Sequence, residues 1–148
     1  MKMIKKNNNS NAKQAYSKLP VWRLQDLYPS INSNKIKLDL NYIKKSSKLF
    51  EKKFEGKIKK LNSIELFKAI KKLEKIDEVT DKILSFAHLL IAENSDHEKN
   101  KIFFQLMQEK ITDYSSCLIF FTLELNQIEE KKINILLKKP YFRKFKTW

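Results

Sequence analysis

The stretch Lys35–Phe54, KIKLDLNYIKKSSKLFEKKF, contains the pattern that decides the fold. Every third or fourth residue in it is apolar or small: Ile36, Leu40, Ile43, Ser47, Phe50 and Phe54. Such spacing places these side chains on one face of an α-helix. Gly56, the only glycine in the chain, follows where a left-handed C-terminal cap is expected. The sequence therefore predicts a long amphipathic helix from Lys35 to Phe54.

The same spacing continues after Gly56. Asn62 and Ser63 are good N-cap residues, so a second helix should begin there and extend to about Leu73. A third helix should follow with little break. Its apolar stripe consists of Ile76, Val79, Ile83, Phe86 and Leu90.

Ser95–Glu98 has the Ser-x-x-Glu form of a capping box, which predicts that the longest helix begins there and reaches about Ile128. The apolar run Cys117–Phe121 within it should be the most buried part of the chain. A short helix is expected over Lys131–Leu137. Pro140 then opens a final segment, in which we expect Phe142, Phe145 and Trp148 to be exposed at a truncated end.

Composition supports an all-α fold, because one glycine and three prolines in 148 residues are few for sheets and their turns. We expect a bundle of about four to six helices with an extended N-terminal arm. Residues 1–18 are basic and polar and predict a disordered tail, and residues 19–148 form the helical domain. The arm should be pinned by its large apolar residues Trp22, Leu24, Leu27 and Tyr28.

The net charge of +14 suggests nucleic acid as a partner. However, Arg23 and Arg143 are the only arginines, and specific recognition of bases and phosphates favours arginine. We therefore interpret the lysines as a solvated surface, without a specific nucleic-acid or membrane partner. The apolar run Cys117–Phe121 is too short to span a bilayer, and Cys117, the single cysteine, fits a reducing compartment.

The sequence shows no catalytic, cofactor-binding or metal-binding constellation. Its histidines, His88 and His97, are not part of a His-Glu-x-x-His motif, and a site that combines them with Glu93 or Asp96 is weakly supported. Cys117 lies in apolar surroundings, which raise a thiol pKa. The serines (Ser46, Ser47, Ser115 and Ser116) have no adjacent base, and the carboxylate pairs Asp77-Glu78 and Glu129-Glu130 fall on polar faces.

Four segments resemble the oligoendopeptidase F family of thimet-type zinc metallopeptidases. The arm Trp22–Ser30, with its Trp-x-Leu-x-Asp-Leu-Tyr-Pro-Ser pattern, is similar to the opening of that family. Phe50 and Phe54 with Glu55-Gly56-Lys57 resemble the end of its first helix. Ser85–Leu89, and Gln108–Ile111 followed by Phe120–Leu125, resemble two later segments. The resemblance extends from about Leu19 to the end of the chain, and the four segments occur in the family's order.

This resemblance implies a cytoplasmic zinc endopeptidase that cleaves short peptides. The N-terminal helices would form a wall and lid of the substrate channel. Zinc and the catalytic glutamate would belong to a C-terminal catalytic domain with His-Glu-x-x-His, which has no counterpart here, so we expect the chain alone to be inactive. The alternatives are a stand-alone helical protein-interaction module and a basic nucleic-acid-binding helical protein.

Overall fold

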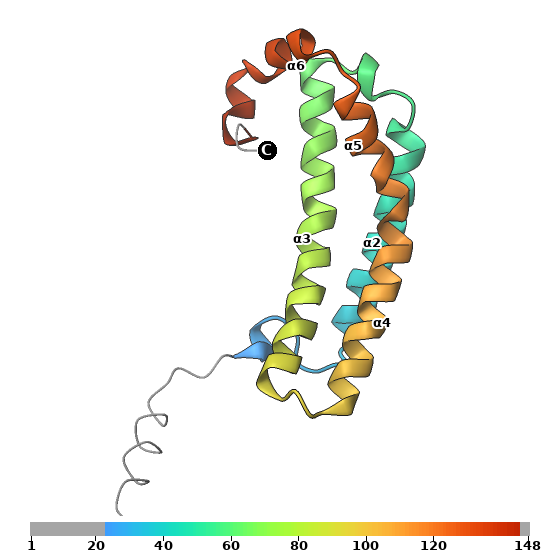
Figure 1. Cartoon of the computed structure of the whole chain (residues 1–148), viewed down its shortest axis with the longest axis vertical. Coiled ribbons are helices and arrows are strands. Elements are labelled where there is room, and N and C mark those ends of the chain that lie inside the picture. The colour runs from blue at the N-terminus through green and yellow to red at the C-terminus, as the bar shows by residue number, and fades with distance from the viewer. Residues whose placement is uncertain (1–22, 146–148) are drawn as a thin grey trace, which may run out of the picture.

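The computed structural model describes residues 23–145, with side chains as far as Phe142. Within this range it confirms the all-α prediction, because it contains helices and no strand. The helices are α2 (Asn34–Phe54), α3 (Ser63–Glu93), α4 (Glu98–Ser115), α5 (Ile119–Asn126) and α6 (Glu130–Leu137). Figure 1 shows α2, α3 and the α4–α5 column running side by side, with α6 at one end of the bundle. The predictions for residues 1–18 and for Trp22 and Trp148 lie outside the described residues.

Helix α2 matches the predicted bounds closely. Ser33 caps its first turn, with its hydroxyl accepting a hydrogen bond from the Lys35 amide at 3.3 Å. All six residues of the predicted stripe are buried: Ile36, Leu40, Ile43, Ser47, Phe50 and Phe54. Gly56 has a φ of +71°, the left-handed conformation that glycine adopts without strain. It ends α2 and directs the chain into the short 3-10 turn Ile58–Lys60.

Helix α3 is continuous, so the predicted break between Leu73 and Ile76 is wrong. The residues at the expected break, Glu74 and Lys75, are good helix formers, and both form ion pairs along α3. The start of α3 is confirmed at Asn62, which caps the helix and forms a capping box with Glu65.

The predicted capping box at Ser95–Glu98 is also wrong. Helix α4 begins at Glu98, and His97 occupies the N-cap without a side-chain hydrogen bond. The turn between α3 and α4 is held instead by asparagines. The Asn94 side-chain oxygen accepts a hydrogen bond from the Asp96 backbone amide at 3.1 Å. The side-chain amide of Asn100 donates a hydrogen bond to the Leu90 carbonyl at 2.9 Å.

The helix predicted to be the longest and to reach Ile128 is interrupted by a 3-10 turn at Ser116–Leu118, and α5 ends at Asn126. The longest described helix is α3, with 31 residues, so this prediction is wrong. The Ser115 hydroxyl donates to the Ile111 carbonyl, and the Ser116 hydroxyl donates to the Asp113 carbonyl. Such bonds from side chains to the preceding turn compete with regular helical bonding. They give a local reason for the tighter turn between α4 and α5.

The N-terminal arm is pinned to the bundle as predicted, although it is not fully extended. Residues Leu24–Asp26 form a 3-10 turn. Leu24 and Tyr28 are buried in the core, and Leu27 packs against it. The Tyr28 ring lies 5.3 Å from the Phe86 ring in an edge-on arrangement, which joins the arm to α3.

Two predictions about burial are wrong. Ile119 is 61% exposed, so the Cys117–Phe121 run is not buried on all sides; only Leu118 and Phe121 in it are fully in the core. Conversely, Phe142 is fully buried, with its ring 5.7 Å from Phe67 of α3. Phe142 belongs to the turn Pro140–Phe145. This turn folds back onto α3, so the Phe142 ring packs against that helix. The side chain of Phe145 lies outside the described residues.

Candidate functional site

A groove at the α6 end of the bundle is lined mainly by aliphatic side chains, and we call it the apolar groove. Its volume is about 500 Å³. Helix α3 contributes Leu66, Ile70 and Leu73, the α5 segment contributes Phe121, Leu125 and Ile128, and α6 contributes Ile133 and Leu137. Thr122, Asn126 and Glu130 add polar atoms to the lining. Apolar walls with few polar groups, at this volume, are typical of sites that receive an apolar partner.

Helix α5, which forms one wall of the groove, is anchored to the loop after α2. One carboxylate oxygen of Glu124 accepts a hydrogen bond from the Gly56 amide at 2.6 Å, and the other accepts from the Ile58 amide at 3.1 Å. Beside it, the Phe50 ring lies 5.6 Å from the Phe121 ring. A carboxylate that binds backbone amides forms strong, charge-assisted bonds. Glu124 therefore fixes the position of α5, which provides one wall of the groove.

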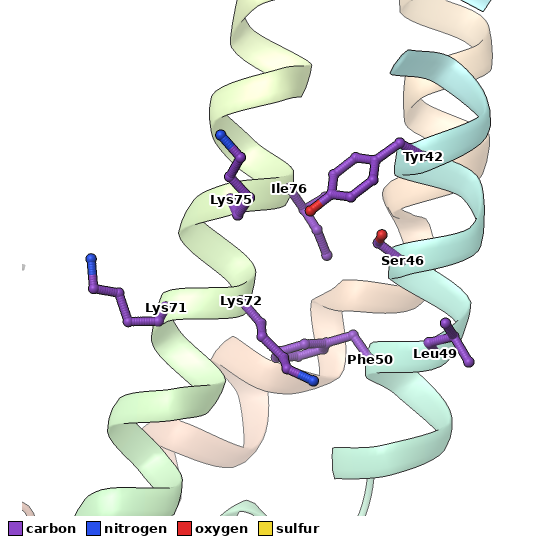
Figure 2. A pocket seen from close by; sticks show the side chains of 8 residues that line it. All are labelled: Tyr42, Ser46, Leu49, Phe50, Lys71, Lys72, Lys75 and Ile76. Atoms are coloured by element: carbon purple, nitrogen blue, oxygen red, sulfur yellow. The ribbon is translucent and has the colours of Figure 1, made fainter. Parts of the chain in front are cut away.

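A second hollow lies between α2 and α3, and we call it the lysine pocket. It has a volume of about 370 Å³ and is lined by Tyr42, Ser46, Leu49, Phe50, Lys71, Lys72, Lys75 and Ile76. Figure 2 shows the Tyr42 ring projecting from α2 toward α3, and the Lys72 side chain running toward Phe50. The pocket thus has an apolar floor and a basic rim.

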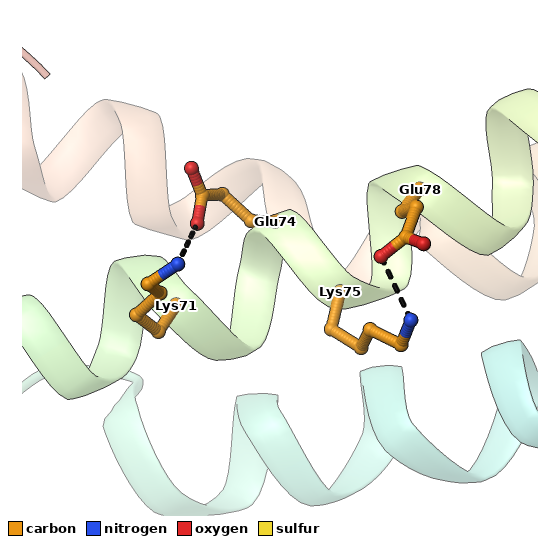
Figure 3. Close-up of polar contacts among 4 residues, drawn as sticks. All are labelled: Lys71, Glu74, Lys75 and Glu78. Carbon is orange, nitrogen blue, oxygen red and sulfur yellow. Dashed lines mark hydrogen bonds and ion pairs between the residues drawn. The ribbon is translucent and has the colours of Figure 1, made fainter. Parts of the chain in front are cut away.

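The other two lysines of the lysine pocket are engaged along their own helix. Lys71 pairs with Glu74 at 3.1 Å, and Lys75 pairs with Glu78 at 2.8 Å (Figure 3). Ion pairs between adjacent turns of one helix, at a surface in contact with solvent, contribute little to stability.

A polar cluster fixes the N-terminal arm at the opposite end of the bundle. The Tyr28 hydroxyl donates to an Asp39 carboxylate oxygen at 2.7 Å, and the Lys82 ammonium lies 4.6 Å from the Tyr28 ring centre. The pKa of Tyr28 is raised, mainly by burial and also by the hydrogen bond to Asp39. Partial burial and the neighbouring Lys35 lower the pKa of Lys82. Because the Tyr28 ring is fully buried, the cluster serves to hold the arm.

The histidines considered from the sequence are not brought together. The exposed His88 on α3 packs edge-on against Phe104 at 4.4 Å, whereas His97 is the N-cap of α4. Within residues 23–142, no three His, Cys, Asp or Glu side chains are grouped so that they could hold a metal ion. The structure therefore gives no support for the site with Glu93 or Asp96.

Among the candidate nucleophiles and carboxylates, the pKa of Cys117 agrees with the prediction and that of Asp77 does not. Desolvation raises the pKa of Cys117, as expected, and its sulfur contacts the Tyr114 carbonyl oxygen at 3.5 Å. Ser47 is fully buried, and its hydroxyl has no hydrogen-bond partner among the described residues. Asp77 differs from the prediction of a solvated carboxylate, because burial and the nearby Asp81 raise its pKa.

Sequence reasoning missed both hollows. The apolar residues of α6 gave a signal for the groove, since Ile133 and Leu137 are separated by one helical turn. The wall formed by α5 could not be inferred, because the sequence does not show that Glu124 of α5 binds the loop at Gly56.

Comparison with known proteins gives no relative: no family model, curated protein sequence or solved structure matches this chain. Among the described helices, none combines the length and the apolar character needed to cross a membrane.

Proposed function

We propose that the chain is the N-terminal helical region of an oligoendopeptidase F-like zinc metalloendopeptidase of the cytoplasm. The observation that carries the proposal is that the segments resembling this family contact one another in pairs. Tyr28 of the opening segment packs against Phe86 of the Ser85–Leu89 segment. Glu124 of the Phe120–Leu125 segment binds Gly56 at the end of the first helix. Such pairing is expected if the segments act together to shape the bundle.

These contacts define the structural role that we propose for the segments. The first pair fixes the arm at one end of α3, and the second pair fixes α5 to the loop after α2. Both contacts determine how the helices are arranged, and neither provides a catalytic group. A family whose N-terminal helices form a wall would keep such residues for shape, which is the role we propose for this chain.

We propose that all catalytic residues lie in another part of the enzyme. Zinc would activate the water that attacks the peptide bond, in the part that contains His-Glu-x-x-His. No step is assigned to a residue of this chain. Its contribution is the wall of the channel, and the apolar groove is the surface that we propose packs against the catalytic part.

Complementation tests this proposal. The chain is co-expressed with the catalytic part of an oligoendopeptidase F-type enzyme whose own N-terminal helices have been removed. Alone, the chain should purify without stoichiometric zinc and should not cleave a quenched fluorescent oligopeptide. Together, the two parts should cleave it. Zinc-dependent cleavage by the chain alone, or failure of the folded chain to restore activity, contradicts the proposal.

Matched variants in α6 test the role of the groove. Ile133 lines the groove, whereas Ile135, on the same helix, is 63% exposed. Ile133→Glu should abolish the restored activity because it places a charge in an apolar contact. Ile135→Glu should leave the activity unchanged. Equal losses in both variants would show that the groove is not the contact surface.

The alternative of a stand-alone interaction module uses the same groove for a different partner. It is favoured if the chain is a compact monomer that melts cooperatively and shows little binding of a hydrophobic dye. The proposed enzyme region, with an apolar groove left open, should bind the dye and self-associate.

A further inference from the structure

The outer face of α2, next to the lysine pocket, carries a row of exposed apolar residues. Leu38, Tyr42 and Leu49 are 61%, 39% and 67% exposed, and they are separated by four and seven residues. This spacing places them on one side of the helix, next to the buried stripe and at the edge of the lysine pocket, which Tyr42 and Leu49 also line. Large apolar side chains arranged along one face, rather than scattered singly, indicate a contact surface.

Lysines surround this row and the pocket beside it. On α2, Lys45 lies between Tyr42 and Leu49 on the exposed face. On α3, Lys72 lines the lysine pocket, and its side chain runs toward Phe50 in Figure 2. The combined surface is therefore basic and apolar, within a chain whose net charge is +14.

We propose that this α2–α3 surface binds an acidic amphipathic segment of another protein. One large apolar side chain of the segment enters the lysine pocket, between Tyr42 and Ile76. Carboxylates on either side of it meet Lys72 and Lys45. The pocket volume of about 370 Å³ lies near the lower end of the range of about 300–1,000 Å³ for ligand pockets, which suits a single side chain.

The chemistry of the surface selects this partner over other polyanions. A nucleic acid would contact the lysines but would leave the aliphatic Leu38 and Leu49 without a role. A bilayer could bind the lysines and the apolar row, but a flat lipid surface would not fill the lysine pocket between the two helices. An acidic segment with an apolar side would contact the lysines, the apolar row and the lysine pocket together. This inference does not depend on the proposed peptidase function.

Fluorescence anisotropy with a short labelled peptide tests the proposal. The probe is a fluorescein-labelled helical peptide with leucine and phenylalanine on one face and glutamates on the other. Lys72→Glu should weaken binding about tenfold, and Leu49→Gln should weaken it at least about threefold. The matched control is Lys101→Glu, on the exposed side of α4, which makes the same charge change and should alter binding less than about twofold.

Competitors and a second peptide decide among the possible partners. A peptide of the same composition, with leucine and phenylalanine distributed around the helix, should bind at least about tenfold more weakly. Equal binding of the two peptides, or equal weakening by Lys72→Glu and Lys101→Glu, would overturn the proposal. Stronger binding of single-stranded DNA, or of vesicles containing phosphatidylglycerol, would also overturn it. Circular dichroism should show unchanged helicity in all three variants, since each position is exposed.

Discussion

Removal of the Glu124 carboxylate is the sharpest perturbation of the bundle. The side chain accepts hydrogen bonds from the exposed Gly56 amide and from the amide of Ile58, whose side chain is buried. Glu124→Ala removes both bonds and leaves the Ile58 amide without its partner. We assign about 1 kcal/mol to the exposed bond and about 2 kcal/mol to the other, so the free energy of unfolding should fall by about 3 kcal/mol.

Urea denaturation followed by circular dichroism measures this loss. With a slope of about 1–3 kcal/mol per molar urea, the midpoint should move down by about 1–3 M. Glu129→Ala is the matched control, because Glu129 is exposed, lies near the same end of the bundle and forms no side-chain capping bond. If both substitutions lowered the midpoint equally, the anchor would have no special role and the account of α5 would be refuted.

Three further substitutions follow from burial. Phe142→Ala should destabilise the chain by about 3–5 kcal/mol in thermal unfolding, because the ring is fully buried against Phe67; a loss below about 1 kcal/mol would show that the last turn does not pack. Ser47→Ala should be neutral or raise stability by up to about 1 kcal/mol in urea, since the buried hydroxyl lacks a partner in the described part of the chain. Burial and Asp81 raise the pKa of Asp77 in the folded state, so the charged form costs stability above that pKa. Asp77→Asn should therefore stabilise the protein at neutral pH, with a gain that disappears as the pH falls through the folded-state pKa; a gain independent of pH would contradict this.

The parts of the fold that local chemistry determines could be predicted from the sequence. The α2 stripe depends on helical spacing, and its end at Phe54 depends on the left-handed Gly56. The start of α3 depends on the capping chemistry of Asn62. Each of these signals lies within a few residues of the feature that it determines.

Features that depend on distant contacts could not be predicted. The Ser95–Glu98 pattern has the form of a cap, yet α4 begins at Glu98 because Asn94 and Asn100 hold the turn in another way. The burial of Phe142 requires Phe67, many residues earlier in the chain. Both hollows depend on how whole helices are placed, and the anchor at Glu124 joins residues separated by 66 and 68 positions.

The proposal that this chain belongs to an oligoendopeptidase F-like enzyme is tested most directly by sequencing the DNA that follows the codon for Trp148. We predict a continuation, in frame or after a frameshift, that encodes His-Glu-x-x-His and a later zinc-binding glutamate. A stop codon followed by unrelated sequence would contradict the proposal and would favour a stand-alone interaction module.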